Sequence, residues 1–96
     1  MKVITKQPDE NAQVTELEGG LSSLQHVVGG YIEAIDFIND SVLICNEEGK
    51  LNGLPVNFIF GNDFIVGPVI ICGTSDEEFT SLSEDQIKCI MRHLND

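Results

Sequence analysis

The chain has 96 residues, 42% of them hydrophobic, and its 16 acidic side chains outnumber five basic ones to give a formal net charge of −11. This length predicts one small domain, residues 1–96, and the apolar content argues against a disordered chain. The charge argues against direct nucleic acid binding and favours a partner protein with a basic surface, although acidity also keeps small proteins soluble.

The cysteines and the longest apolar run indicate the compartment. There are three cysteines with no CxxC pair, which argues against a disulfide framework and favours a reducing environment. The start of the chain lacks the apolar stretch of a secretory signal, and the run 64–72 is too short to span a bilayer. We expect a cytoplasmic protein without membrane contact. Since chains of this size are marginally stable alone, we also expect a homodimer.

The first third of the chain predicts a hairpin followed by a short helix. Residues 2–6 are β-branched and residues 13–18 alternate in polarity, which is typical of two paired strands. Between two glycine pairs, apolar residues at helical spacing predict a helix over 21–28. Gly29 is placed to end it in the left-handed conformation.

The middle of the chain predicts a second hairpin and a buried strand. Residues 31–38 and 41–46 flank Asn39 and Asp40, which tolerate turn geometry. The run 64–73 is apolar on both alternating faces, which is typical of a central strand covered on both sides. Its Gly-Pro pair predicts a bulge or an interruption.

The last segment predicts an amphipathic helix. Ser83 and Gln86 have the spacing of a capping box, and Leu82 is placed to contact Ile87 across the helix start. The apolar stripe of this helix consists of Ile87, Ile90, Met91 and Leu94. The elements together predict an α+β domain with a small, mostly antiparallel sheet of about five strands and two helices packed on one side.

The sequence does not predict an enzyme. It holds only two histidines, His26 and His93, and no motif for a nucleophile, a phosphate-binding loop or a zinc hydrolase. Cys89 and His93 share a helix face opposite the apolar stripe. They are either half of a metal site shared across a dimer or incidental surface residues, since zinc needs three or four ligands. We therefore predict no catalytic residue, no cofactor and no metal site.

Several runs of the sequence, in a fixed order, resemble a known family. The runs are LQHVVGGYIEAI, VLICNEEGKLNGLPVN, DFIVGPVIICG and the start of the last helix. They resemble domain-of-unknown-function family 3846, which comprises small proteins of gut bacteria, phages and mobile elements. The resemblance extends from about Leu21 to the last helix and implies a setting, but no catalytic residues. After LPVN the family has a more polar helical stretch, whereas this chain has FIFGND.

Residues 46–57 contain the most specific motif of that resemblance. We expect them to form a structured loop whose shape is set by Gly49, Asn52, Gly53, Pro55 and Asn57. We expect a positive φ at Gly49, a second turn at Asn52 and Gly53, and a helical turn beginning at Pro55. Its expected anchors to the core are Leu51, Leu54 and Val56. The side chains of Asn46, Asn52 and Asn57 either satisfy the backbone of the loop or form a polar recognition rim.

The leading hypothesis is an acidic, non-enzymatic inhibitor from a phage or mobile element. It would occupy a nucleic-acid-binding surface on a host defence nuclease of the CRISPR or restriction type. The predicted partner-binding residues are Glu47, Glu48, Lys50, Asp76, Glu77 and Glu78. One alternative is a small-ligand binder, such as a sponge for a signalling nucleotide, at a dimer interface lined by Tyr31, the asparagines and Lys50. Another is an accessory module.

Overall fold

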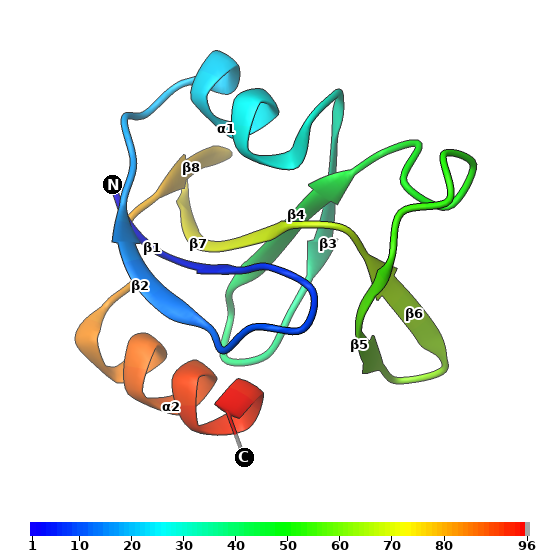
Figure 1. Ribbon diagram of the computed structural model, residues 1–96. Coiled ribbons are helices and arrows are strands. Elements are labelled where there is room, and N and C mark those ends of the chain that lie inside the picture. Colours follow the sequence, from blue (N-terminus) through cyan, green and yellow to red (C-terminus); the bar gives the residue numbers. More distant parts are fainter. Residues whose placement is uncertain (96) are drawn as a thin grey trace.

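A computed structural model describes residues 1–95 as an α+β fold (Figure 1). The main sheet has six strands in the order β2-β1-β7-β4-β3, with β8 beside β7, while β5 and β6 form a separate hairpin. All strand pairs are antiparallel. This confirms the predicted fold class, with six rather than about five strands in the main sheet. The elements are β1 (Lys2–Lys6), β2 (Gln13–Glu16), α1 (Leu21–Val28), β3 (Ile32–Asp36), β4 (Val42–Asn46), β5 (Val56–Phe60), β6 (Asp63–Val66), β7 (Val69–Ser75), β8 (Glu78–Thr80) and α2 (Glu84–Asn95).

Strand β7 is the centre of the sheet. It pairs with β1 on one edge and β4 on the other, and β8 pairs with its far end. Residues 69–72 are completely buried. Successive side chains of a strand point to opposite faces, so both faces of β7 need an apolar cover.

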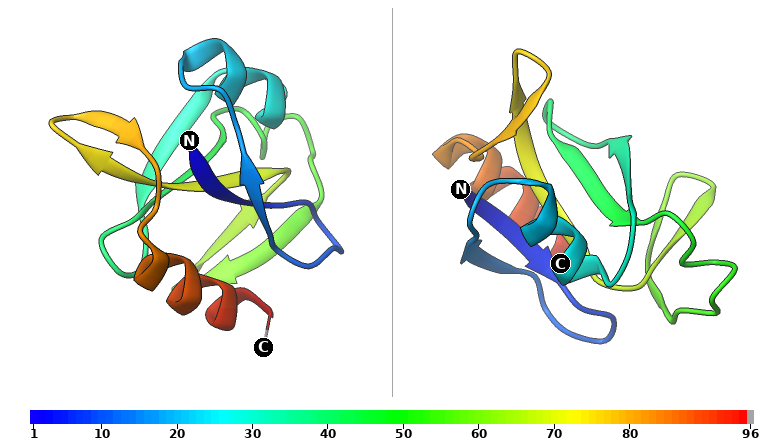
Figure 2. Two further views of the ribbon diagram at one scale, coloured as in Figure 1. Left: turned by 90° about the vertical axis from the view of Figure 1, so that its left-hand side faces the viewer. Right: turned by 90° about the horizontal axis from the view of Figure 1, so that it is seen from above.

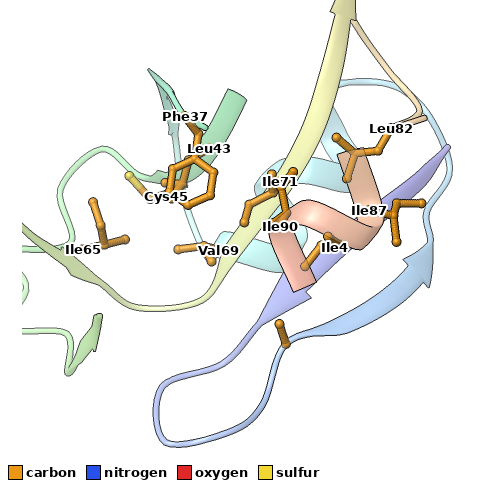
Figure 3. Packing of buried hydrophobic residues seen from close by; sticks show 11 residues of the cluster. Ile4, Phe37, Leu43, Cys45, Ile65, Val69, Ile71, Leu82, Ile87 and Ile90 are labelled. Carbon is orange, nitrogen blue, oxygen red and sulfur yellow. The ribbon is translucent and has the colours of Figure 1, made fainter. Parts of the chain in front are cut away.

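The two helices supply these covers from opposite faces of the sheet (Figure 1). The α1-side cluster consists of Val3, Leu24, Val28, Ile44, Ile70 and Cys72. The α2-side cluster, drawn in Figure 3, consists of Ile4, Ala12, Phe37, Leu43, Cys45, Ile65, Val69, Ile71, Leu82, Ile87 and Ile90. The prediction that both helices pack on one side is therefore wrong. The reason is that β7 is apolar on both faces, and one layer of helices covers only one of them.

The local signals at both helices are confirmed. Gly29 ends α1 with φ 80°, in the left-handed region. Ser83 Oγ accepts a hydrogen bond from the Gln86 backbone N–H at 3.2 Å, and Gln86 Oε1 accepts one from the Ser83 N–H at 2.9 Å. Leu82 and Ile87 are buried in one cluster, as the predicted contact requires. Within residues 1–95, neither helix combines the length and apolar character that crossing a bilayer requires.

Both predicted hairpins are present. β1 pairs with β2, and β3 pairs with β4. Asn39 and Asp40 have φ of 56° and 58°, which the tight turn between β3 and β4 requires. The run 64–73 divides at Gly67 and Pro68 into β6 and β7, so only its second part is the central covered strand.

Strands β5 and β8 were not predicted from the sequence. β5 lies where a loop with a helical turn was expected, and Pro55 precedes this strand instead of beginning a helical turn. Phe58 and Phe60, two residues apart, both contact Phe37, with ring centroids 6.1 Å and 4.7 Å away. This spacing is that of one strand face, and it packs the β5–β6 hairpin on the α2-side cluster.

We predict that Ile90→Ala lowers the free energy of unfolding by about 2–5 kcal/mol, because it leaves a cavity in the α2-side cluster. Ile90 is completely buried, whereas its neighbour Cys89 is exposed on the same helix. Cys89→Ala is therefore the matched control and should change stability by less than about 0.5 kcal/mol. Urea unfolding followed by circular dichroism measures both; equal effects would contradict the described packing of α2.

Candidate functional site

Residues 46–55, which we call the turn segment, form a chain of consecutive turns between β4 and β5. Backbone hydrogen bonds run from Gly49 N to Asn46 O, from Asn52 N to Glu48 O, from Gly53 N to Lys50 O and from Leu54 N to Gly49 O, at 2.9–3.2 Å. Gly53 has a φ of 67°, as the predicted second turn requires. The segment is therefore an ordered structure held by its own backbone.

Gly49 is required for a different reason from the predicted one. The φ angle of Gly49 is not positive, so the expectation of a left-handed turn there is wrong. A Cβ at this position would lie 2.9 Å from Val66 Cγ2 and 3.3 Å from Asn46 O, so the constraint is close packing. Leu54 approaches both Gly49 and Gly67 and is the anchor of the segment. Leu51 is 86% exposed and Val56 is 50% exposed, so the prediction that these two side chains anchor the loop is wrong.

Asn46 joins the turn segment to the end of α1. Its side chain is 8% exposed; Nδ2 donates to Val28 O at 3.1 Å, and Oδ1 accepts from the Glu48 backbone N–H at 2.8 Å. A Cβ on Gly30 would lie 2.9 Å from Asn46 Nδ2, so only glycine leaves room for this amide. The role of Gly30 was not predicted from the sequence. A second glycine directly after α1 could have indicated it, because Gly29 alone is enough to end the helix and Gly30 therefore needs another reason.

The three asparagines of this region have different roles. Asn57 Nδ2 donates to Lys6 O and to Gly67 O, both at 2.8 Å, which ties β5 to β1 and to the link between β6 and β7. Asn46 and Asn57 therefore satisfy backbone groups, which is the first of the two predicted roles. Asn52 is exposed, and among residues 1–95 its side chain has no hydrogen-bond partner. Only Asn52 is available for a recognition rim.

The turn segment separates two shallow pockets. The α1-side pocket has a volume of about 320 Å³ and is lined by Gln25, Gly29, Gly30, Tyr31, Asn46, Glu48 and Asn52. The α2-side pocket has a volume of about 280 Å³ and is lined by Glu33, Ile35, Cys45, Asn46, Glu47, Lys50, Leu51, Asp63, Phe64, Ile65 and Val66. Glu47 and Glu48 are adjacent in sequence but lie in different pockets.

Two of the charged residues in the α2-side pocket, Lys50 and Asp63, are paired with each other. Lys50 Nζ donates to the Asp63 carboxylate; this bond and the Phe64 backbone N–H hold the Asp63 pKa below its usual value. Burial raises the pKa of the Cys45 thiol to about 11, and the Glu33 carboxylate adds to this shift. Cys45 is therefore a neutral thiol near neutral pH, and the pocket lacks an activated nucleophile within the described chain.

The six predicted partner-binding residues do not form one cluster. Glu47, Glu48 and Lys50 follow the end of β4, whereas Asp76, Glu77 and Glu78 lie at the tip of the β7–β8 hairpin. Because β4 and β7 are antiparallel, these groups lie at opposite ends of the sheet, as both views of Figure 2 show. The predicted surface therefore divides into two.

One side of the sheet nevertheless carries acidic residues from both groups. Glu48 lines the α1-side pocket, and Glu77 and Glu78 line a third pocket with residues of α1. Ile32 packs with the α1-side cluster and Ile35 with the α2-side cluster, so strand alternation places Asp36 on the α1 side. Sequence reasoning missed Asp36, although the alternation of residues 31–38 could have identified its face.

The lysine and arginine residues lie on the other side, whereas the exposed His26 belongs to α1. Lys2 Nζ donates to Glu84 of α2 at 3.0 Å, the Lys6 ammonium lies 5.9 Å from the Phe58 ring centroid, and Lys50 lines the α2-side pocket. The remaining two basic residues belong to α2 itself. Within residues 1–95, the α1 side carries no lysine or arginine; all five are on the α2 side, namely Lys2, Lys6, Lys50, Lys88 and Arg92.

The remaining candidate groups for chemistry, Cys89 and His93, line one open pocket along α2. Cys89 and His93 are exposed on α2, and the His93 ring centroid lies 6.3 Å from that of Phe37. Residues 1–95 contain no group of three or more histidine, cysteine, aspartate or glutamate side chains placed to hold a metal ion.

The sequence model of a domain of unknown function, DUF3846, matches residues 1–95. Because the match covers nearly the whole chain, the chain belongs to the DUF3846 family, which confirms the resemblance carried by its motifs. No curated protein and no solved structure matches the chain. Family membership assigns no activity, so a function has to be inferred from the surface described above.

We predict that Asn46→Ala lowers the free energy of unfolding by about 1–3 kcal/mol, because Val28 O and the Glu48 N–H lose their buried partner. Asn52→Ala, in the same segment but exposed, is the control and should change it by less than about 0.5 kcal/mol. Chemical denaturation measures both. A neutral Asn46→Ala variant would show that the amide does not hold the turn segment on α1.

We predict that stability declines as the pH rises from 9 to 11, partly through two thiols. Burial raises the pKa of Cys45 and of Cys72 from 9.0 to about 11. The unfolded chain therefore loses these protons first, so this contribution is complete below pH 9 and is lost as the pH approaches 11. A Cys45→Ala/Cys72→Ala variant should lack this part of the decline. Identical profiles of urea midpoint against pH for variant and parent would contradict it.

Proposed function

We propose that this DUF3846 protein is a non-enzymatic interaction module that docks the α1 side of its sheet on a basic surface of a partner protein. The observation that carries the proposal is the separation of charge: the α1 side presents Asp36, Glu48 and Glu77 and, within residues 1–95, no lysine or arginine. A surface of one sign attracts its opposite and speeds the encounter with it.

The charge pattern makes a nucleic-acid-binding protein the preferred class of partner. A surface that binds phosphates is basic, and an acidic protein competes with nucleic acid for it. The acidic groups lie at both ends of the α1 side, at the turn segment and at the β7–β8 tip, and so span the face. The proposed setting of phages and mobile elements makes a host defence nuclease, of the CRISPR or restriction type, the first partner to test.

The alternative of a signalling-nucleotide sponge has less support. Tyr31 and Asn52 line the α1-side pocket, as that alternative requires, but Lys50 lies in the other pocket and is paired with Asp63. The α1-side pocket instead contains Glu48, which repels phosphate. A thermal shift against a panel of nucleotides tests it, since a ligand that binds only the folded state raises the melting temperature.

The test of the proposal compares two double variants of equal charge. Glu48→Gln/Glu77→Gln removes two negative charges from the α1 side. Glu47→Gln/Asp85→Asn removes two from the α2 side, where Glu47 lines the α2-side pocket and Asp85 belongs to α2. Both variants have a net charge of −9, two less negative than the −11 of the parent.

We predict that the α1-side variant binds a captured nuclease roughly three- to tenfold more weakly, chiefly through slower association, while the α2-side variant binds like the parent. Pull-down from a panel of purified CRISPR effectors and restriction nucleases identifies the partner, and surface plasmon resonance at low and high salt measures the variants. Capture of no nuclease, binding insensitive to salt, or equal loss in both variants would contradict the proposal.

A further inference from the structure

The α1-side pocket combines three groups that attract a cation. Tyr31 is 67% exposed, and the same pocket is lined by Glu48, which has a carboxylate, and by Gln25 and Asn52, which have amide groups. The backbone carbonyl oxygen of Tyr31 accepts a hydrogen bond from the Glu47 backbone N–H at 2.8 Å, which fixes the tyrosine backbone next to the turn segment. An aromatic face and a carboxylate in one pocket are suited to a positively charged group.

The end of α1 adds to this field. The C-terminal end of a helix carries a partial negative charge from its last carbonyl groups. Gly29 and Gly30, which follow the last turn of α1, both line the pocket, and their backbone N–H groups donate to Gln25 O at 2.8 Å and 3.1 Å. The five lysine and arginine side chains lie on the α2 side, so none of them neutralises this negative potential.

Size and chemistry select one kind of cation. A single carboxylate does not provide the oxygen ligands that calcium or magnesium requires. A guanidinium group is planar, stacks on an aromatic ring and donates two parallel hydrogen bonds to a carboxylate. A volume of about 320 Å³ is at the small end for ligand sites and suits one side chain better than a nucleotide.

We propose that the α1-side pocket receives an arginine side chain, with its guanidinium on the Tyr31 ring and paired with Glu48. The inference rests on the proposed function, because the arginine belongs to the basic surface of the partner. It goes beyond that function by naming one contact point on a broad acidic face.

Nuclear magnetic resonance titration of the ¹⁵N-labelled full chain with N-acetyl-arginine amide tests the pocket directly. The expected shifts are at the backbone amides of Gly29, Gly30, Glu48 and Asn52, with none at Asp76–Glu78 on the β7–β8 tip. N-acetyl-citrulline amide, which has the same shape without the charge, should cause no shifts. Equal shifts at all acidic segments would overturn the inference, since they would show only non-specific attraction.

Variants separate the two proposed contacts. Glu48→Gln should weaken the arginine amide at least about threefold, the effect of losing an exposed ion pair. Tyr31→Ala should weaken it similarly, whereas Tyr31→Phe should bind like the parent, because the aromatic face is kept. Glu47→Gln, on the adjacent residue in the other pocket, is the charge-matched control. Unchanged binding in Glu48→Gln would overturn the inference, as would equal weakening in Glu47→Gln.

The failure of this inference is distinguishable from failure of the proposed function. If a nuclease is captured in a salt-dependent manner but arginine amide causes no localised shifts, the inference about the pocket is wrong. The proposed binding role of the acidic face is then unaffected. If localised shifts occur and no basic partner is found in the panel, the pocket binds guanidinium and the proposed function is wrong.

Discussion

The structure depends on the burial of both faces of β7. Val69, Ile70, Ile71 and Cys72 are all completely buried, and strand geometry sends alternate members of this run to opposite sides. A single helical layer would leave half of them in water, at a cost of about 1.5–3 kcal/mol for each large side chain. Two helices on opposite faces are the consequence, and they give the small sheet two chemically different sides.

The two helices are held by contacts of different charge. α2 has a capping box and acidic residues in its first turn, and a Lys2–Glu84 pair links it to β1. α1 has no acidic residue in its first turn and no side-chain cap, and it is held at its far end by the buried amide of Asn46. An ion pair therefore joins α2 to β1, whereas α1 is joined to the turn segment by a neutral contact. The α1 side is left acidic, with a pocket beside that contact.

Sequence reasoning succeeded where one short motif determines the structure. Ser83 and Gln86 predicted the start of α2, and Gly67 with Pro68 predicted the break between β6 and β7. It failed where the determining contact is distant in sequence. Phe58 forms a strand because it packs on Phe37, and Gly49 is a glycine because Val66 lies against it. The six predicted partner-binding residues were chosen because they lie in loops. The antiparallel register of β4 and β7 places them at opposite ends of the sheet, and the local sequence does not predict that register.

The conformation of the β7–β8 tip bears on whether the acidity serves only solubility. Asp76 and Glu77 have φ of 51° and 68°, in the left-handed region that glycine and asparagine favour. A glutamate there costs about 1 kcal/mol or more relative to an unstrained position, and solubility can be met by an acid at any exposed site. Glu77 also lines the pocket with Leu21 and Leu24 of α1, on the side that lacks lysine and arginine within the described chain. The two-residue turn itself requires these φ values, as at Asn39 and Asp40, so the feature to explain is a glutamate where glycine or asparagine would be unstrained. A role for the acidic face in binding supplies a reason, since strain of this kind is retained where the position of a side chain matters.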